Sequence, residues 1–338
     1  MRIISCASYY GTGSSAITDL LSEYENVCSL SNYEFRFVHD PDGISDLEYN
    51  LVENHNRLNS GHALKRFKKL VEFYSGNKFI KKYEPFFNNQ WLSISTKYIN
   101  SLTDFKCKGW WFYDMYDKGE FFYYRKAILN KILQLTIWRN KEDKYLNVLP
   151  NEITLYSKPT EEEFLNKTKK YLNELFSVAN YSNKDNVLVD QIVPPTNLKR
   201  YNRYFDDLIV FVVERDPRDL YLLEKYVWKT NIIPVENPKI FCEWYEYTRS
   251  HRKKEVFPDN VLFVQFEDMI YKYDETVEKI ENKLGFSKEE HINIKKYFNP
   301  DTSKKNTRIW LEYDIDEELK IIEKELAEYL YDYSALKR

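Results

Sequence analysis

Cysteine, glycine and histidine are scarce in this chain, and each scarcity excludes a class of protein. The 338 residues include 4 Cys, 8 Gly and 5 His. The cysteines are far apart and form no C-x-x-C pair, which argues against a disulfide framework, a zinc site or a redox motif. The histidines have no spacing typical of metal ligands. We therefore predict reduced thiols and no bound metal.

A long apolar run and an excess charge are also missing. No stretch approaches the ~20 apolar residues of a membrane span, and no charged segment followed by an apolar stretch precedes the first predicted strand. Lys and Arg number 50 against 53 Asp and Glu, a net charge of −3. This balance argues against a dedicated nucleic-acid-binding protein, although it permits a local basic cleft. We expect a soluble, cytoplasmic protein, and the sequence leaves its oligomeric state open.

The chain does have a strand, turn and helix pattern near its N-terminus. Ile3 and Ile4 begin an apolar strand, and the turn after it consists mostly of small residues: Gly11, Thr12, Gly13, Ser14 and Ser15. Glycines let backbone N–H groups approach an anion, and a helix start adds unpaired N–H groups with a partial positive charge. Ser14 or Ser15 can cap the helix and also donate to a phosphate. The pattern predicts a phosphate-binding loop; because no lysine follows Gly13, an ordinary turn is the alternative.

Three later apolar segments, 187–189, 208–213 and 261–266, are predicted strands, with another around 27–30. Because helical patterns alternate with these strands, we predict an α/β fold with a parallel sheet flanked by helices. A helix is expected over 217–229, with Asp216 as its cap and Pro217 in its first turn.

Residues 44–180 read as mainly helical. Their clearest helix spans 160–176, where Thr160 and Glu163 form a capping box. Another helical face carries Ile128, Ile132 and Leu135. We predict one domain over 1–338, in which 44–180 is an insertion that covers the nucleotide core and forms the acceptor side. A final helix is expected over 316–333.

The segment Val212-Val213-Glu214-Arg215-Asp216-Pro217-Arg218-Asp219 resembles a motif of the sulfotransferases that use 3′-phosphoadenosine 5′-phosphosulfate. In that family the motif is a strand followed by R-[DN]-P-[RK]-D, and its first arginine binds the 3′-phosphate. The resemblance thus implies this role for Arg215, whose planar guanidinium can donate two parallel hydrogen bonds to phosphate oxygens. If the resemblance is set aside, the alternative interpretation of these residues is a helix cap followed by arginines on the protein surface.

Two further segments carry the resemblance. Residues 261–268, followed by a helix and Leu284-Gly285, look like the family's strand, aromatic-Glu-Asp and helix, in which Glu267 would have a bracing role. Residues 303–310 lie where the family has a basic loop over the cofactor, which implies that Lys304 and Lys305 contact it; a solvated charge run is the alternative. The family has the phosphate-loop NTPase-like fold. The resemblance therefore implies sulfuryl transfer from the phosphosulfate co-substrate to a hydroxyl or amine, with a glycan as a candidate acceptor.

The sequence departs from the family at two phosphate contacts. Gly11 stands where the family usually has Lys or Arg, and Leu223 replaces a serine. The resemblance covers 1–30 and 186–310 only. Two other functions therefore stay open: a small-molecule kinase using ATP and Mg²⁺, and a non-catalytic binding protein of the same fold.

The acceptor's proton requires a base. The family places one, commonly histidine, at the end of the strand before the arginine motif, and this position implies Asp190. A carboxylate can act as a base when a dry pocket raises its pKa. His39, after a strand-like run, and His62, beside a basic helix, are the other candidates.

Overall fold

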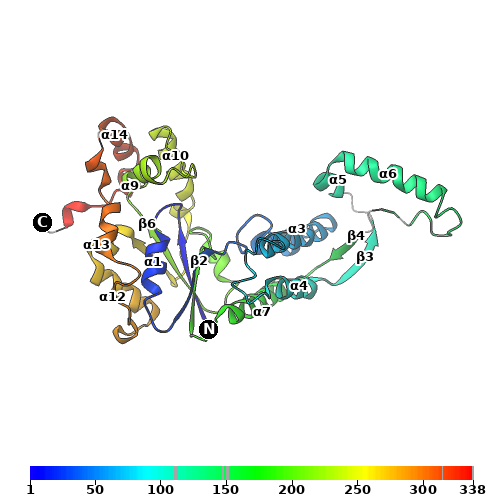
Figure 1. Ribbon diagram of the computed structural model, residues 1–338, viewed down its shortest axis with the longest axis horizontal. Coiled ribbons are helices and arrows are strands. Elements are labelled where there is room, and N and C mark those ends of the chain that lie inside the picture. The colour runs from blue at the N-terminus through cyan, green and yellow to red at the C-terminus, as the bar shows by residue number, and fades with distance from the viewer. Residues whose placement is uncertain (110–112, 147, 150–151, 314, 337–338) are drawn as a thin grey trace. The chain divides into compact units, whose positions relative to one another are not determined.

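The computed structural model describes residues 1–109, 113–146, 148–149, 152–313 and 315–336. The chain divides into two compact units (Figure 1). Unit 1 consists of Met1–His39 and Leu172–Arg338, and unit 2 of Asp40–Tyr171. In the described parts of both units, no helix is long and apolar enough to cross a membrane.

Unit 1 is built on a five-stranded sheet with the order β2-β5-β1-β6-β7, and every strand pair that its described residues form is parallel. The strands are β1 (Arg2–Ser8), β2 (Val27–Glu34), β5 (Asn186–Asp190), β6 (Leu208–Glu214) and β7 (Val261–Gln265). All residues of β5 and β6 are buried, as expected where helices cover both faces of a parallel sheet. The predicted α/β fold, a phosphate-loop NTPase-like parallel sheet flanked by helices, is confirmed.

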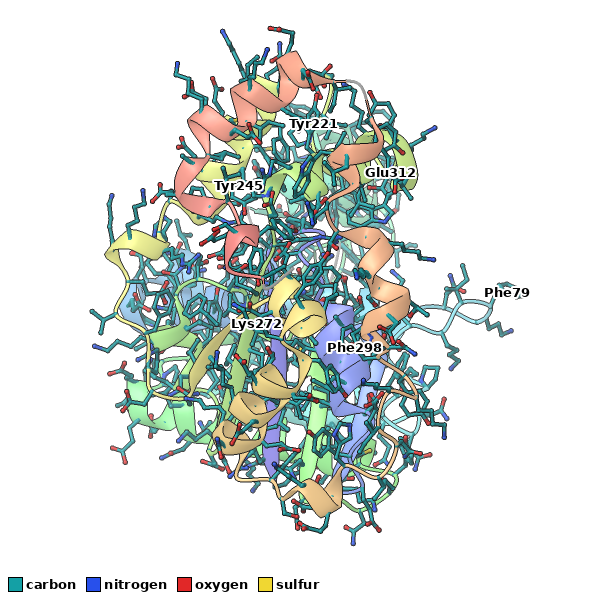
Figure 2. All side chains as sticks on the ribbon, turned by 90° about the vertical axis from the view of Figure 1, so that its left-hand side faces the viewer. Phe79, Tyr221, Tyr245, Lys272, Phe298 and Glu312 are labelled. Carbon is teal, nitrogen blue, oxygen red and sulfur yellow. The ribbon has the colours of Figure 1, made fainter. Side chains whose placement is uncertain are left out.

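The helices of unit 1 form two apolar clusters, one of which includes the sheet. In one cluster, α1 (Ser14–Leu21) and α12 (Tyr273–Leu284) pack with β1 and β6. In the other, α9 (Pro217–Leu222) and α10 (Pro238–Arg249) pack with α14 (Asp316–Glu325). Figure 2 shows the buried Tyr221 and Tyr245 among the helices of this second cluster.

Shorter segments connect these helices. They are α8 (Leu198–Asn202), the π-helix η2 (Leu223–Trp228), η3 (Arg252–Lys254), α11 (Phe266–Tyr271), η4 (Lys288–Glu290), α13 (Pro300–Ser303), η5 (Lys304–Asn306), η6 (Ile309–Glu312), η7 (Ala327–Tyr329) and η8 (Tyr333–Ala335). The final helix ends at Glu325 rather than 333, because the chain tightens into a 3₁₀ turn after Leu326.

Unit 2 is mainly helical, as predicted, but it also contains a strand pair. Its described elements are α2 (Ile44–Glu48), the π-helix η1 (Tyr49–Glu53), α3 (Arg57–Ser75), α4 (Trp91–Leu102), β3 (Phe105–Gly109), α5 (Tyr113–Lys118), α6 (Glu120–Leu135) and β4 (Glu152–Tyr156), with α7 (Glu161–Ala179) ending in unit 1. β3 and β4 are antiparallel. The expected capping box begins α7: Glu163 N donates to Thr160 Oγ1 at 3.2 Å, and Thr160 N to Glu163 Oε2 at 2.9 Å. Whether the units make up one domain with an insertion stays a prediction.

Candidate nucleotide site

The glycine loop joins β1 to α1 through two residues with positive φ. Gly11 has φ +72° and Gly13 has φ +104°, in the left-handed region. Gly13 is the N-cap of α1, and in the described chain no side chain caps that helix. The expected serine cap is therefore wrong: the left-handed turn at Gly13 makes Ser14 and Ser15 the first two helical residues. As the first helical residues, Ser14 and Ser15 have N–H groups without an intrahelical acceptor, which can donate to an anion. The Ser14 hydroxyl also interacts with Asp190.

Neither glycine can carry a side chain in this backbone. A Cβ at Gly13 would lie 2.8 Å from Phe266 Cδ2, and one at Gly11 would lie 2.7 Å from Leu220 Cδ1 and 2.9 Å from Trp228 Cζ3. A side chain at Gly11 would therefore have to keep a positive φ and displace the side chains of Leu220 and Trp228.

The loop borders a cavity of about 640 Å³ at the carboxyl ends of the strands. Its lining includes Gly11, Gly13, Ser14, Ser15, Arg36, His39, Gln191, Arg215, Trp228, Phe266, Ser303 and Asn306. In an open α/β sheet, ligands bind at this edge, and the volume is that of a typical small-molecule pocket. Every lining residue belongs to unit 1.

Arg215 lies in the wall of this cavity with only 3% of its surface exposed. Nη1 donates to Gly11 O at 3.3 Å and Nη2 donates to Asn306 O, whereas Nε has no hydrogen-bond partner among the residues that the structure describes. The guanidinium carbon lies 4.3 Å from the centre of the Phe266 ring. Burial lowers the pKa of Arg215 from its usual value. A buried, incompletely bonded cation is a suitable partner for an anion.

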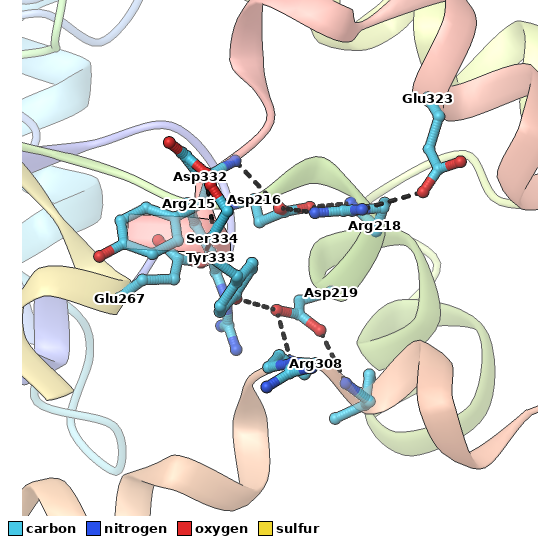
Figure 3. Close-up of polar contacts among 12 residues, drawn as sticks. Arg215, Asp216, Arg218, Asp219, Glu267, Arg308, Glu323, Asp332, Tyr333 and Ser334 are labelled. Atoms are coloured by element: carbon cyan, nitrogen blue, oxygen red, sulfur yellow. Dashed lines mark hydrogen bonds and ion pairs between the residues drawn. The ribbon is translucent and has the colours of Figure 1, made fainter. Parts of the chain in front are cut away.

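The rest of the arginine motif braces Arg215. Asp216 caps α9 as predicted, accepting from Arg218 N at 2.9 Å. Figure 3 shows Arg218 between Asp216 and Glu323, with nitrogen–oxygen distances of 2.7 and 2.9 Å. Glu267 Oε1 accepts from Asp216 N at 2.9 Å, which agrees with the bracing role expected for it.

Asp219 ties the motif to the segment that follows η5. It accepts from the N–H groups of Arg308 and Ile309, each at 3.0 Å, and from Tyr333 Oη at 3.3 Å (Figure 3). These bonds hold the backbone after Asn306, whose carbonyl accepts from Arg215. The segment that the sequence marked as a basic loop is thus anchored through backbone groups.

Asp190 ends β5, beside Cys6 of β1, with 8% of its surface exposed. Its Oδ1 has no hydrogen-bond partner in the described part of the chain. Burial, and then the Glu34 carboxylate, raise the pKa of Asp190 to about 7, although Ser14 and Gln191 act in the opposite direction. A carboxyl group poised near neutral pH can give or take a proton.

The two candidate histidines belong to different units. His39 lines the cavity, and its Nε2 lies 2.9 Å from Gln191 O. A carbonyl oxygen only accepts, so this nitrogen carries a hydrogen and is not the basic one. His62 lies on α3 in unit 2, and burial lowers its pKa.

Three other expected cofactor residues do not line the cavity. The Thr12 hydroxyl is buried and donates to Tyr9 O at 2.7 Å, within its own turn. Lys304 and Lys305 are exposed on η5, where Ser303 and Asn306 line the cavity instead. A role for these two lysines as cofactor contacts stays a prediction.

Arg36 is a cationic residue of the cavity that the sequence analysis did not single out. It follows the end of β2, between the buried Phe35 and Phe37, and its Nη1 lies 3.8 Å from Glu34 Oε2. The alternation of apolar and charged residues in Phe35-Arg36-Phe37 was the available signal in the sequence. Because a strand end can be assigned to the ligand edge only once the sheet order is known, the sequence alone did not identify Arg36.

Comparison with family models and with curated proteins finds no match. Among solved structures, the chain is similar to the sulfotransferase domain of the curacin biosynthetic pathway, at 13% identity over 98% of this chain and 99% of that one, with a TM-score of 0.42. Sulfotransferase STF1 from Mycobacterium tuberculosis H37Rv matches at 13% identity over 91% and 76%, with a TM-score of 0.34. Retinol dehydratase in complex with androsterone and inactive cofactor PAP matches at 15% over 100% and 83%, also with a TM-score of 0.34. Sulfotransferases, the family that the motifs resemble, are thus among the solved structures similar to this chain, and any function must be argued from its own residues.

Proposed function

We propose that this protein is a sulfotransferase, which transfers a sulfuryl group from 3′-phosphoadenosine 5′-phosphosulfate to a hydroxyl or amine. One observation carries the proposal: a glycine loop at the start of α1 and the buried Arg215, whose Nε lacks a partner among the described residues, border the same cavity. A nucleotide with phosphates at both its 3′ and 5′ positions has the two anionic groups that this arrangement can bind.

Each end of the nucleotide has a partner in the proposal. The N–H groups at Gly13 and the first turn of α1, with the Ser14 and Ser15 hydroxyls, bind the 5′-phosphosulfate. Arg215 binds the 3′-phosphate, and the exposed part of the Trp228 ring offers a flat surface for adenine. Arg36, which lines the cavity, faces the sulfuryl oxygens. It supplies the positive charge that a Lys or Arg at the position of Gly11 supplies in the family.

The proposed reaction is an in-line displacement at sulfur. The acceptor oxygen or nitrogen forms a bond to sulfur while the bond from sulfur to the 5′-phosphate oxygen breaks. 3′-Phosphoadenosine 5′-phosphate leaves with that electron pair. Asp190, as the carboxylate, takes the acceptor's proton, and His39 and His62 are the next candidates for this role. The loop donors stabilise negative charge as it develops on the bridging oxygen.

The proposal extends to the domain organisation, the acceptor class and the cellular compartment. We assign residues 1–338 to a single sulfotransferase-like domain, in which 44–180 forms the acceptor side, and a glycan is one acceptor class that fits the family. The buried, unpaired thiols of Cys6, Cys28 and Cys242 suit a protein of the reducing cytoplasm.

A kinase that uses ATP and Mg²⁺ is the second candidate, and one observation favours it. Asp190 ends the strand beside β1, close enough to Ser14 for that hydroxyl to affect its pKa. A strand-end aspartate with a serine at the loop is the pair that holds Mg²⁺ in many nucleotide triphosphatases. The missing loop lysine counts against this candidate.

A thermal-shift panel on the full chain separates the candidates. It compares 3′-phosphoadenosine 5′-phosphate in EDTA, ATP with Mg²⁺, and buffer alone. A ligand at about 100 times its Kd stabilises the native state by about 2.7 kcal/mol. The proposal expects this stabilisation with 3′-phosphoadenosine 5′-phosphate in EDTA and none with ATP and Mg²⁺. The reverse pattern would favour the kinase, and no stabilisation by either would favour a non-catalytic protein.

A further inference from the structure

Helix α6 (Glu120–Leu135) exposes an apolar stripe that unit 2 does not cover. All sixteen of its residues are described, and none of them is buried. The stripe follows helical spacing, with 50–80% of each residue exposed: Phe121, Tyr124, Ile128, Ile132 and Leu135. Helix α3 of the same unit instead buries Leu64, Phe67 and Val71. A helix that presents its apolar face to solvent marks an interaction surface.

The charges around the stripe are mainly positive. Arg125, Lys126 and Lys131 lie on α6, whereas Glu120 is its single acid, although the whole chain has a net charge of −3. Arg125 and Lys131 come directly after Tyr124 and directly before Ile132, at the two sides of the stripe. The apolar character continues past the helix end with the exposed Ile137. Figure 1 shows α6 beyond the end of the β3–β4 pair, away from α3 and α4 of the same unit.

We propose that α6 binds the surface of an anionic lipid bilayer, lying in the plane of the interface. The stripe enters the boundary between headgroups and acyl chains, and Arg125 and Lys131, at its two sides, contact acidic headgroups. A basic amphipathic helix with aromatic residues on its apolar side is the typical form of such a surface anchor.

The charges favour a lipid surface over a second copy of the chain. Two α6 stripes packed together would bring Arg125 and Lys131 of one copy near the same cations of the other. An anionic surface neutralises these charges while it covers the same apolar residues. This inference is independent of the proposed sulfotransferase activity, because no residue of α6 lines the cavity of unit 1.

Vesicle co-sedimentation of the full chain tests the proposal. We expect the protein to bind vesicles of phosphatidylcholine with about 30% phosphatidylglycerol, more weakly at high salt, and to bind pure phosphatidylcholine vesicles poorly. Ile128→Glu with Ile132→Glu should reduce binding about tenfold or more. Arg125→Gln with Lys131→Gln should reduce binding only to anionic vesicles.

Val256→Glu with Leu311→Glu is the matched control, because both residues are exposed apolar residues outside α6 and the cavity. It should bind vesicles as the wild type does, and circular dichroism should show all variants folded. The proposal fails if the wild type ignores anionic vesicles or if the stripe variant still binds them. It also fails if sedimentation velocity without lipid finds a wild-type dimer that the stripe variant abolishes, since a second copy would then be the partner.

Discussion

At the residue scale, the proposed chemistry depends on two side chains that the fold leaves incompletely bonded. Asp190 Oδ1 and Arg215 Nε are buried without a hydrogen-bond partner among the described residues. Leaving a buried polar atom unpaired costs about 1–3 kcal/mol. Arg215, after β6, lines the cavity, whereas Asp190, at the end of β5 on the other side of β1, does not line it, although the next residue, Gln191, does. We therefore interpret them as features of a binding site and not as packing defects.

Asp190→Asn tests the base. The substitution nearly preserves shape but removes the proton acceptor, so kcat should fall ~10²-fold or more while nucleotide affinity is kept. Because the active form is the carboxylate and its pKa is about 7, wild-type kcat should rise with pH through about 7. Rate measurements from pH 5.5 to 9 on both proteins check this. Normal turnover by Asp190→Asn would move the role to His39 or His62.

Gly13→Ala tests the loop geometry. The new Cβ meets Phe266 at 2.8 Å, and the residue would have to keep a φ of +104°. Strain and overpacking together should lower the free energy of unfolding by about 2–4 kcal/mol. Gly285→Ala is the matched control, because its φ is also positive, at +70°, but nothing lies within 4 Å of its Cβ. It should cost only about 1 kcal/mol. Equal losses in urea denaturation would show that close packing at Gly13 is not the constraint.

At the scale of elements, a single carboxylate fixes the segment that leads into α13. Glu23 is fully buried just after α1, and it accepts from the N–H groups of Lys295, Tyr297 and Phe298 at 2.8–3.0 Å. His291 Nε2 lies 2.7 Å from its Oε2. This contact holds one wall of the cavity, since Tyr297 and Phe298 line it.

Glu23→Gln should therefore loosen that wall. Glutamine lacks the negative charge of Glu23, and its NH₂ group would face backbone N–H groups, which are also donors. The free energy of unfolding should therefore fall by about 2–4 kcal/mol. Amide exchange should become faster over 291–298 in particular. Glu25→Gln, at an exposed position two residues on, should change neither quantity. Unchanged exchange in Glu23→Gln would mean that other contacts hold the segment.

The elements that the sequence predicted are those with strong local signals. β5 and β6 are continuous apolar runs, and α7, α9 and α12 have caps that the sequence shows directly. The β3–β4 pair was missed because each strand has only five residues and β3 carries two lysines. Ile128, Ile132 and Leu135 were correctly assigned to one helical face, but periodicity cannot tell whether that face is covered. In the structure, this face of α6 is exposed and not covered.

At the scale of the whole molecule, the candidate site consists of segments far apart in the sequence. Gly13, Ser14, Ser15 and Arg215 each lie in a motif and could be proposed from the sequence. Arg36 and Asn306 could not, because only the parallel order β2-β5-β1-β6-β7 and the return of the chain after α13 bring them to the cavity. Leu220 and Trp228, the side chains that crowd Gly11, are likewise distant from it in sequence.

Buried carboxyl groups predict the pH dependence of stability. Burial is the main cause that raises the pKa of Asp190 and of Asp219 to about 7 and of Glu267 to about 8. Between about pH 4 and these values the native state holds more protons than the unfolded state, so stability falls as pH rises. We expect the free energy of unfolding to drop by at least about 2 kcal/mol from pH 5 to pH 8.5.

Urea denaturation at several pH values measures this slope, and Asp190→Asn should make it shallower. Asp117 and Glu318, whose pKa values are lowered, change stability mainly below about pH 5. Burial lowers the pKa of His62, so this group makes stability rise with pH up to about 6.5 and offsets part of the fall. A free energy of unfolding that rises from pH 5 to pH 8.5 would mean that the buried carboxyl groups are ionised in the native state throughout.

The central claim, that the cavity of unit 1 binds a nucleotide with two anionic groups, is tested most directly by calorimetry. The titration adds 3′-phosphoadenosine 5′-phosphate, in EDTA, to the wild type, to Arg215→Ala and to the control Arg139→Ala, an exposed residue outside the cavity and outside residues 303–310. Removing a charged phosphate partner costs ~1.5–3 kcal/mol. We predict one site per chain in the wild type, the same affinity in Arg139→Ala, and at least about tenfold weaker binding in a folded Arg215→Ala. Equal affinity in the wild type and Arg215→Ala, or no binding to the wild type, would contradict the claim.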